Sequence, residues 1–94
     1  MNTIAVVIPS YRVTRHIIGV IDAIGPEVAR IYVVDDQCPD GSGDFVEANC
    51  RDSRVKVLRH AVNQGVGGAV MTGYRAAIAE GLSIIVKVDG DGQM

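Results

Sequence analysis

The sequence contains no tryptophan, and aromatic residues make up only 4% of its 94 residues. Hydrophobic residues nevertheless account for 48% of the chain, and most of them are valine, isoleucine and alanine. Small and β-branched apolar residues of this kind are typical of parallel strands covered by helices. Because the length suffices for one small domain, we expect a single α/β unit.

Cysteines, basic clusters and long hydrophobic runs are also scarce. Cys38 and Cys50 form no CxxC pair, which favours free thiols in a reducing compartment over a disulfide or a zinc site. The net charge is −2 and no basic cluster is present, so we expect no nucleic-acid partner. The opening apolar run, residues 4–8, is too short for a signal peptide or a membrane span. We expect a cytoplasmic chain, and leave open that a longer natural protein lies at the cytoplasmic face of a membrane.

Short apolar runs recur along the chain at near-regular intervals, and each is continuous rather than alternating. Continuous runs of β-branched residues predict strands that are buried on both faces. The runs are residues 4–8, 31–34, 55–58 and 84–88.

Helical signals fill the intervals between these runs. Thr14 is expected to cap a first helix with an apolar stripe from Ile17 to Ile24, and Ser42 or Asp44 a second. A third helix is expected over residues 67–80, with Gly68 and Gly73 allowing close approach to the sheet. The face of this helix that we expect to contact the sheet comprises Val66, Val70, Gly73 and Ala77. Alternating strands and helices predict right-handed βαβ units and a parallel sheet.

Polar residues follow three of the expected strands. Residues 9–12 follow the first strand, Asp35 and Asp36 the second, and residues 89–91 the fourth. In an open parallel sheet these positions lie at one edge, beyond the carboxyl ends of the strands, where ligands bind. A carboxylate there can accept hydrogen bonds from a ribose or a base, and Tyr11 can stack on a base. The competing interpretations are loop capping, most plainly by Asp40, and ordinary packing of the tyrosine.

Asp89 and Asp91 lie two positions apart with flexible glycines beside them. Two carboxylates this close repel each other unless a cation joins them, and an all-oxygen ligand set favours Mg²⁺ or Mn²⁺. An exposed acidic turn is the simpler alternative. The same residues also resemble the nucleophile motif of haloacid-dehalogenase-like phosphatases, although that motif usually follows the first strand of its domain. A phosphatase fragment therefore remains an alternative.

Taken in order, four motifs resemble those of the family 2 glycosyltransferases, and most closely those of the polyprenyl-phosphate sugar synthases. They are VIPSY at residues 7–11, VVDD at 33–36, NQG followed by GGA at 63–69, and VDGDGQ at 88–93. The resemblance covers essentially the whole chain. It implies a GT-A fold with strand order 3-2-1-4 and identifies residues 1–94 as the nucleotide-sugar-binding N-terminal half, truncated after the DxD motif.

The resemblance also implies a set of site residues. The implied nucleotide contacts are Pro9, Tyr11, Val34, Asp36, Asp89, Gly90 and Asp91, and the implied metal ligands are Asp89, Asp91 and Gln93. Many members have Asn-Glu after the tyrosine where this chain has Arg12-Val13, so a contact made by that glutamate does not carry over.

The implied activity is inverting, metal-dependent transfer of a sugar from a GDP- or UDP-linked donor to an acceptor, with a polyprenyl phosphate as one candidate. Catalytic residues are expected beyond Met94, so residues 1–94 alone are expected to be inactive. A non-enzymatic nucleotide-binding module is a further alternative. We also expect the exposed edge of the fourth strand to cause self-association.

Overall fold

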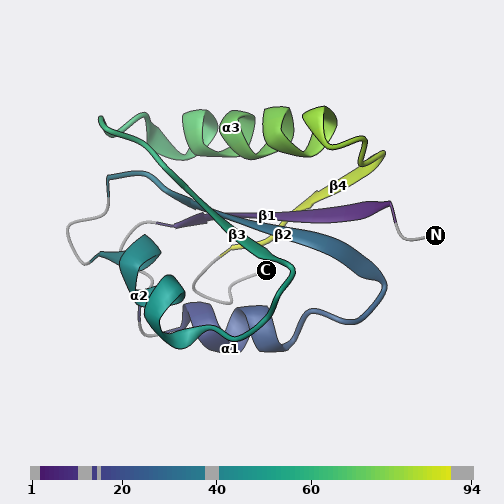
Figure 1. The fold of residues 1–94 in the computed structure, drawn as a ribbon. Helices are drawn as coiled ribbons and strands as arrows, with labels where there is room; N and C mark the ends of the chain where they lie inside the picture. The colour runs from purple at the N-terminus through teal and green to yellow at the C-terminus, as the bar shows by residue number, and fades with distance from the viewer. Residues whose placement is uncertain (1–2, 11–13, 15, 38–40, 90–94) are drawn as a thin grey trace.

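The computed structural model describes residues 3–10, 14, 16–37 and 41–89. In chain order the elements are β1 (Ile4–Ser10), α1 (Ile17–Asp22), β2 (Val28–Asp35), α2 (Ser42–Asn49), β3 (Val55–Arg59), α3 (Gly65–Ala79) and β4 (Ile84–Lys87). The strands form one parallel sheet in the order β3-β2-β1-β4, which confirms the predicted fold class and strand order (Figure 1). Among the described residues, no helix has the length and apolar character that a membrane span requires.

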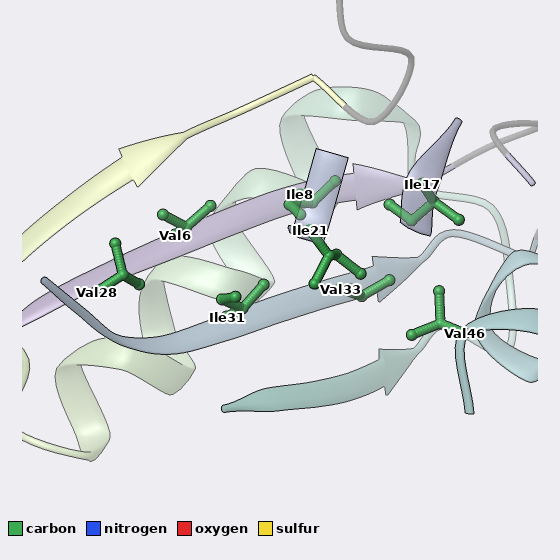
Figure 2. Close-up of a cluster of buried hydrophobic side chains, with 8 residues drawn as sticks. All are labelled: Val6, Ile8, Ile17, Ile21, Val28, Ile31, Val33 and Val46. Atoms are coloured by element: carbon green, nitrogen blue, oxygen red, sulfur yellow. The ribbon is translucent and has the colours of Figure 1, made fainter. Parts of the chain in front are cut away.

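The sheet is covered by α3 on one face and by α1 and α2 on the other (Figure 1). Side chains of a strand alternate between the two faces. Accordingly Val6 and Ile8 of β1 belong to the core beneath α1 and α2, whereas Ala5 and Val7 belong to the core beneath α3. Figure 2 shows the first of these two cores, to which α1 contributes Ile17 and Ile21.

The prediction that every strand is buried on both faces is correct for β1 and β2 but wrong for β3 and β4. Among the residues that the structure describes, β3 and β4 lie at the two ends of the strand order, so each pairs with one neighbour there. Ile84 and Val86 of β4 are 50% and 44% exposed. A continuous apolar run indicates a strand, but it does not show whether the strand lies at the centre or the edge of the sheet.

The predicted caps of the first two helices are wrong. His16, not Thr14, occupies the N-cap position of α1. Gly41, with φ of 67°, occupies the N-cap position of α2, and Ser42 and Asp44 lie inside the first turn. A left-handed backbone at Gly41 turns the chain sharply into α2, which moves the start of the helix ahead of both expected capping residues.

α3 begins two residues earlier than predicted, and its contact face is partly different. Gly73 and Ala77 are buried as expected, but Val66 is 62% exposed, and Ala69 is buried on the contact face instead. A Cβ atom added to Gly73 would overlap the side chain of Val7, which confirms the close approach of α3 to the sheet.

The prediction for Gly68 is wrong. A Cβ atom there would lie 2.6 Å from the Cβ of Gln64, which precedes the same helix, rather than against the sheet.

Arg54, just before β3, joins several segments at the amino ends of β2 and β3, away from the carboxyl edge of the sheet. Its guanidinium donates hydrogen bonds to the main-chain oxygens of Ile24 at 3.0 Å, Gly25 at 2.6 Å and Val28 at 3.1 Å. It also forms an ion pair with Asp52 at 2.7 Å. These bonds join the segment after α1 and the start of β2 to the start of β3.

Candidate functional site

The carboxyl ends of β1, β2 and β4 lie at one edge of the sheet, as the sequence predicted. Pro9 of β1 pairs with Val34 of β2. On the other side of β1, the N–H of Val88 donates to the oxygen of Val7 at 3.0 Å, so the chain leaves β4 towards Asp89 beside β1. The expected site residues Tyr11, Gly90, Asp91 and Gln93 lie outside the described residues, as do Cys38 and Asp40.

Asp35 and Asp36 point to opposite faces of the sheet, because neighbouring side chains of a strand alternate. Asp35 turns towards α2, where its Oδ2 accepts a hydrogen bond from the N–H of Gly43 at 2.9 Å. A carboxylate at this position accepts a hydrogen bond from a main-chain N–H of the first helical turn. Its negative charge also interacts favourably with the positive end of the helix dipole. Asp35 therefore stabilises the start of α2.

Asp36 turns towards α3 and is only 4% exposed. Its Oδ1 accepts hydrogen bonds from the N–H of Gln64 at 2.7 Å and from Nδ1 of His60 at 2.8 Å. Its main-chain oxygen accepts a further bond from Nδ2 of Asn63 at 3.0 Å. Asp36 is thus fixed by the segment that leads from β3 into α3.

The pKa of Asp36 lies below its ordinary value of 3.8. Burial by itself raises the pKa, because it disfavours the charged form. The hydrogen bonds from the Gln64 N–H and from His60 act in the opposite direction and outweigh burial. Asp36 is therefore ionised at neutral pH and acts only as a hydrogen-bond acceptor.

His60 is the residue of this site that the sequence analysis missed. Its Nδ1 contacts Asp36, and its Nε2 lies 2.7 Å from the hydroxyl oxygen of Thr72 on α3. The His60 side chain is only 6% exposed. One signal was available: His60 follows β3 as Asp36 follows β2, and alternation along adjacent parallel strands directs both side chains to the same face.

The segment between β3 and α3 is fastened to the segment after β2. Asn63 donates its N–H to the side-chain oxygen of Gln37 at 3.2 Å, and its own side-chain oxygen accepts from the N–H of Gly65 at 3.1 Å. Gln37 and Gly65 have φ values of 56° and 79°, in the left-handed region. The NQG motif is therefore held next to the end of β2.

Asp89 contributes a half-exposed carboxylate to the same edge, 3.2 Å from Nζ of Lys87. Carboxylate oxygen suits Mg²⁺ or Mn²⁺, so Asp89 fits the implied metal chemically. Within residues 3–10, 14, 16–37 and 41–89, no group of three or more His, Cys, Asp or Glu residues could hold a metal ion. The other implied ligands, Asp91 and Gln93, lie outside those residues.

A parallel sheet in the order 3-2-1-4, with polar side chains beyond its carboxyl ends, defines a doubly wound α/β domain, a class of fold in which ligands bind at that edge. The sequence matches the family model "Glycosyl transferase family 2" over residues 5–94. The chain belongs to this glycosyltransferase family. That assignment supports the family resemblance and decides against the phosphatase alternative.

Two relatives are similar to the chain over part of their own length. Undecaprenyl-phosphate mannosyltransferase of Micrococcus luteus is 39% identical over 72 residues, which cover 76% of this chain and 29% of the relative. Polyprenol monophosphomannose synthase of Mycolicibacterium smegmatis is 34% identical over 92 residues, which cover 93% of this chain and 34% of the relative. The chain thus spans about a third of the length of these relatives.

A solved structure supports the fold independently. TarS residues 1–349 from S. aureus match with a TM-score of 0.66, covering 95% of this chain and 27% of the other. The sequence identity is 20%, so this likeness concerns the fold alone.

Proposed function

We propose that residues 1–94 form the nucleotide-sugar-binding half of a family 2 glycosyltransferase. The complete protein would transfer a sugar from a nucleoside diphosphate sugar to an acceptor, with inversion at the sugar carbon. The observation that carries the proposal is the meeting of Pro9, Val34 and Asp36 at the carboxyl edge of the sheet. Both relatives carry names that specify a mannose transfer or synthesis reaction on a polyprenyl carrier, which favours a lipid phosphate as acceptor here.

We propose as nucleotide contacts the residues that the family resemblance implies. Pro9 and Tyr11 would line the nucleotide, and Asp36 would accept a hydrogen bond from a base N–H or a ribose hydroxyl. Guanine and uracil both carry a ring N–H, so GDP- and UDP-linked donors fit this chemistry equally. The side chain of Val34 is fully buried beneath α3, so its contact would come from the main chain.

The diphosphate would lie beside the segment that follows β4. We propose Asp89, Asp91 and Gln93 as ligands of Mg²⁺ or Mn²⁺, and Gly90 as a close main-chain neighbour of the diphosphate. A cation bound there supplies positive charge that stabilises the departing diphosphate. The acceptor site and any catalytic base would be provided by other parts of the complete protein, at the cytoplasmic face of a membrane. Residues 1–94 alone would then be inactive, because transfer needs both substrates held together.

Calorimetry with UDP and with GDP, on the complete natural protein, tests this proposal. Asp36→Asn keeps the size of the side chain but removes its charge, and exposed Asp22→Asn on α1 is the matched control. We expect the wild type and the control to bind one nucleotide, and Asp36→Asn to bind it about tenfold more weakly. The thermal midpoint of each variant establishes that it is folded. Failure of the wild type to bind either nucleotide would refute the proposal.

We also propose that residues 1–94, when isolated, self-associate through β4. Ile84 and Val86 expose apolar surface on a strand whose only partner within the described residues is β1. An unpaired strand edge with apolar neighbours is a template for a second chain. Light scattering over a range of concentrations should show a mass that increases with concentration, and Val86→Lys should prevent the increase. A mass that stays at one chain throughout would contradict this proposal.

A further inference from the structure

Asp36, His60 and Thr72 form a partly buried chain of polar side chains at the carboxyl edge of the sheet. The chain joins the end of β2, the end of β3 and the middle of α3, through contacts of 2.8 Å and 2.7 Å. We propose that His60 is a positioning residue: it orients the Asp36 carboxylate for the nucleotide and so sets the affinity for the donor. This inference rests on the proposed function.

The hydrogen bonds on Asp36 fix the direction of its carboxylate. Gln64 and His60 both donate to the same oxygen, Oδ1, from two different segments of the chain. Rotation about the Cβ–Cγ bond of Asp36 would break both bonds, each of which is strengthened by the negative charge. The second oxygen, Oδ2, therefore keeps a fixed position, and it is the atom that we propose accepts the hydrogen bond from the nucleotide.

His60 can hold Asp36 because the ring is itself held at both ends. The carboxylate of Asp36 only accepts hydrogen bonds, so Nδ1 of His60 carries the proton between them. In the neutral ring Nε2 then accepts from the hydroxyl of Thr72, which lies on α3. A flip of the ring would remove both partners, so Thr72 fixes the ring and the ring fixes the carboxylate.

This arrangement does more than attach α3 to the sheet. Burial of Ala69, Gly73 and Ala77 already packs the helix against the sheet, and Gln64 already gives Asp36 one donor. The bond from His60 adds no apolar contact; it adds a second direction from which the carboxylate is held. Preorganisation of an acceptor matters most where a ligand must be bound without reorganising the site.

Two substitutions of His60 separate positioning from simple stabilisation. The amide nitrogen of His60→Asn lies as many bonds from Cβ as Nδ1 does, so it can still donate to Asp36 but cannot reach Thr72. The amide nitrogen of His60→Gln corresponds to Nε2, so it can reach Thr72 but leaves Asp36 without this donor. Each variant loses one partly buried hydrogen bond, and we expect comparable decreases in thermal midpoint.

The measurement is the Kd for UDP and for GDP on the complete natural protein, with the thermal midpoint recorded for each variant. We expect His60→Gln to weaken nucleotide binding about tenfold and His60→Asn to stay within about threefold of the wild type. His16, an exposed histidine at the start of α1, provides the control His16→Gln, which should change neither quantity. Equal affinities of the two His60 variants, whether both normal or both reduced, would overturn the inference.

The outcome for Asp36→Asn distinguishes failure of this inference from failure of the proposed function. If the wild type binds a nucleotide, Asp36→Asn weakens binding and His60→Gln does not, only the positioning role of His60 is wrong. If the wild type binds neither UDP nor GDP, the proposed function and this inference are both wrong.

Discussion

The carboxylate of Asp35, the last residue of β2, accepts a hydrogen bond from the N–H of Gly43 in the first turn of α2, at 2.9 Å. A Cβ atom added to Gly43 would lie 2.6 Å from the same carboxylate oxygen and 3.1 Å from Cγ1 of Val57. The strand and the helix approach closely enough here that only glycine fits.

Gly43→Ala should therefore destabilise the protein by about 1–3 kcal/mol, because the new methyl group displaces Asp35 from its hydrogen bond. Urea unfolding measures the change. Gly19→Ala in α1 is the matched control, since a Cβ atom there meets nothing within 4 Å. The control should be stabilised by about 0.5–1 kcal/mol, as expected for alanine in a helix. Equal stabilities of the two variants would contradict the close approach.

Gly73→Ala should also be destabilising, by about 1–3 kcal/mol, because the added methyl group overlaps the side chain of Val7 in the sheet. The change should lower the thermal midpoint by several degrees, since about 1 kcal/mol corresponds to 4–8 °C in a domain of this size. Gly67→Ala, six residues earlier on α3, where an added Cβ atom meets nothing within 4 Å, should be neutral or stabilising. A Gly73→Ala protein that melts with the wild type would show that α3 packs farther from β1.

Acid should weaken the fold through Asp36 and Asp52. Burial raises the pKa of Asp36, but the hydrogen bonds from Gln64 and His60 outweigh burial, so the pKa lies below its ordinary value of 3.8. The hydrogen bond from Arg54 lowers the pKa of Asp52 in the same way. A carboxyl with a lower pKa in the folded state contributes stability that is fully present above its unfolded pKa. That contribution is lost as the pH falls through the folded value. Stability should therefore decrease below about pH 4.

Urea unfolding across this pH range tests the acid effect. Asp36→Asn should lower the stability at neutral pH and flatten its dependence on acid, whereas exposed Asp22→Asn should keep the slope of the wild type. If the stability of Asp36→Asn depended on pH as steeply as that of the wild type, the Asp36 carboxyl would not contribute to the loss of stability in acid.

Mn²⁺ should strengthen nucleotide binding by the complete natural protein about tenfold, because a divalent cation offsets the charge of the diphosphate. Asp91→Ala should abolish the gain while leaving metal-free binding near that of the wild type. Calorimetry with Mn²⁺ and with EDTA measures both states, and Asp22→Ala is the control. Equal affinities with and without the metal would exclude the proposed role of Asp89 and Asp91.

The fold could be predicted from the sequence because each strand is a short run of β-branched residues and each connection is long enough for a helix. The meeting of Pro9, Asp36 and Asp89 at one edge followed from topology alone. Both predictions depend only on the order of strands and helices, so they can be made without knowing any distance between side chains. The sequence did not indicate which runs become edge strands, because edge and central strands can share the same apolar composition.

The errors arose where residues far apart in the sequence compete with local signals. Local rules favour Ser42 or Asp44 as the cap of α2, but Asp35 reaches the helix from the end of β2 because Gly41 turns the chain. His60 has no recognisable motif around it, and its role depends on Asp36 and Thr72, which lie on other elements. Such contacts exist only after the sheet has formed.

The place of β1 in the sheet has a consequence for synthesis on the ribosome. β1 is the first strand to be made, and it lies between β2 and β4, with Ile4 paired to Ile84. β2 can join β1 early, but the other edge of β1 stays without its partner until β4 has left the exit tunnel. Pairings between such distant segments close slowly, because a long loop must be ordered first. A chain still on the ribosome therefore exposes one edge of β1 until residues 84–87 have emerged, although β2 can already cover the other edge.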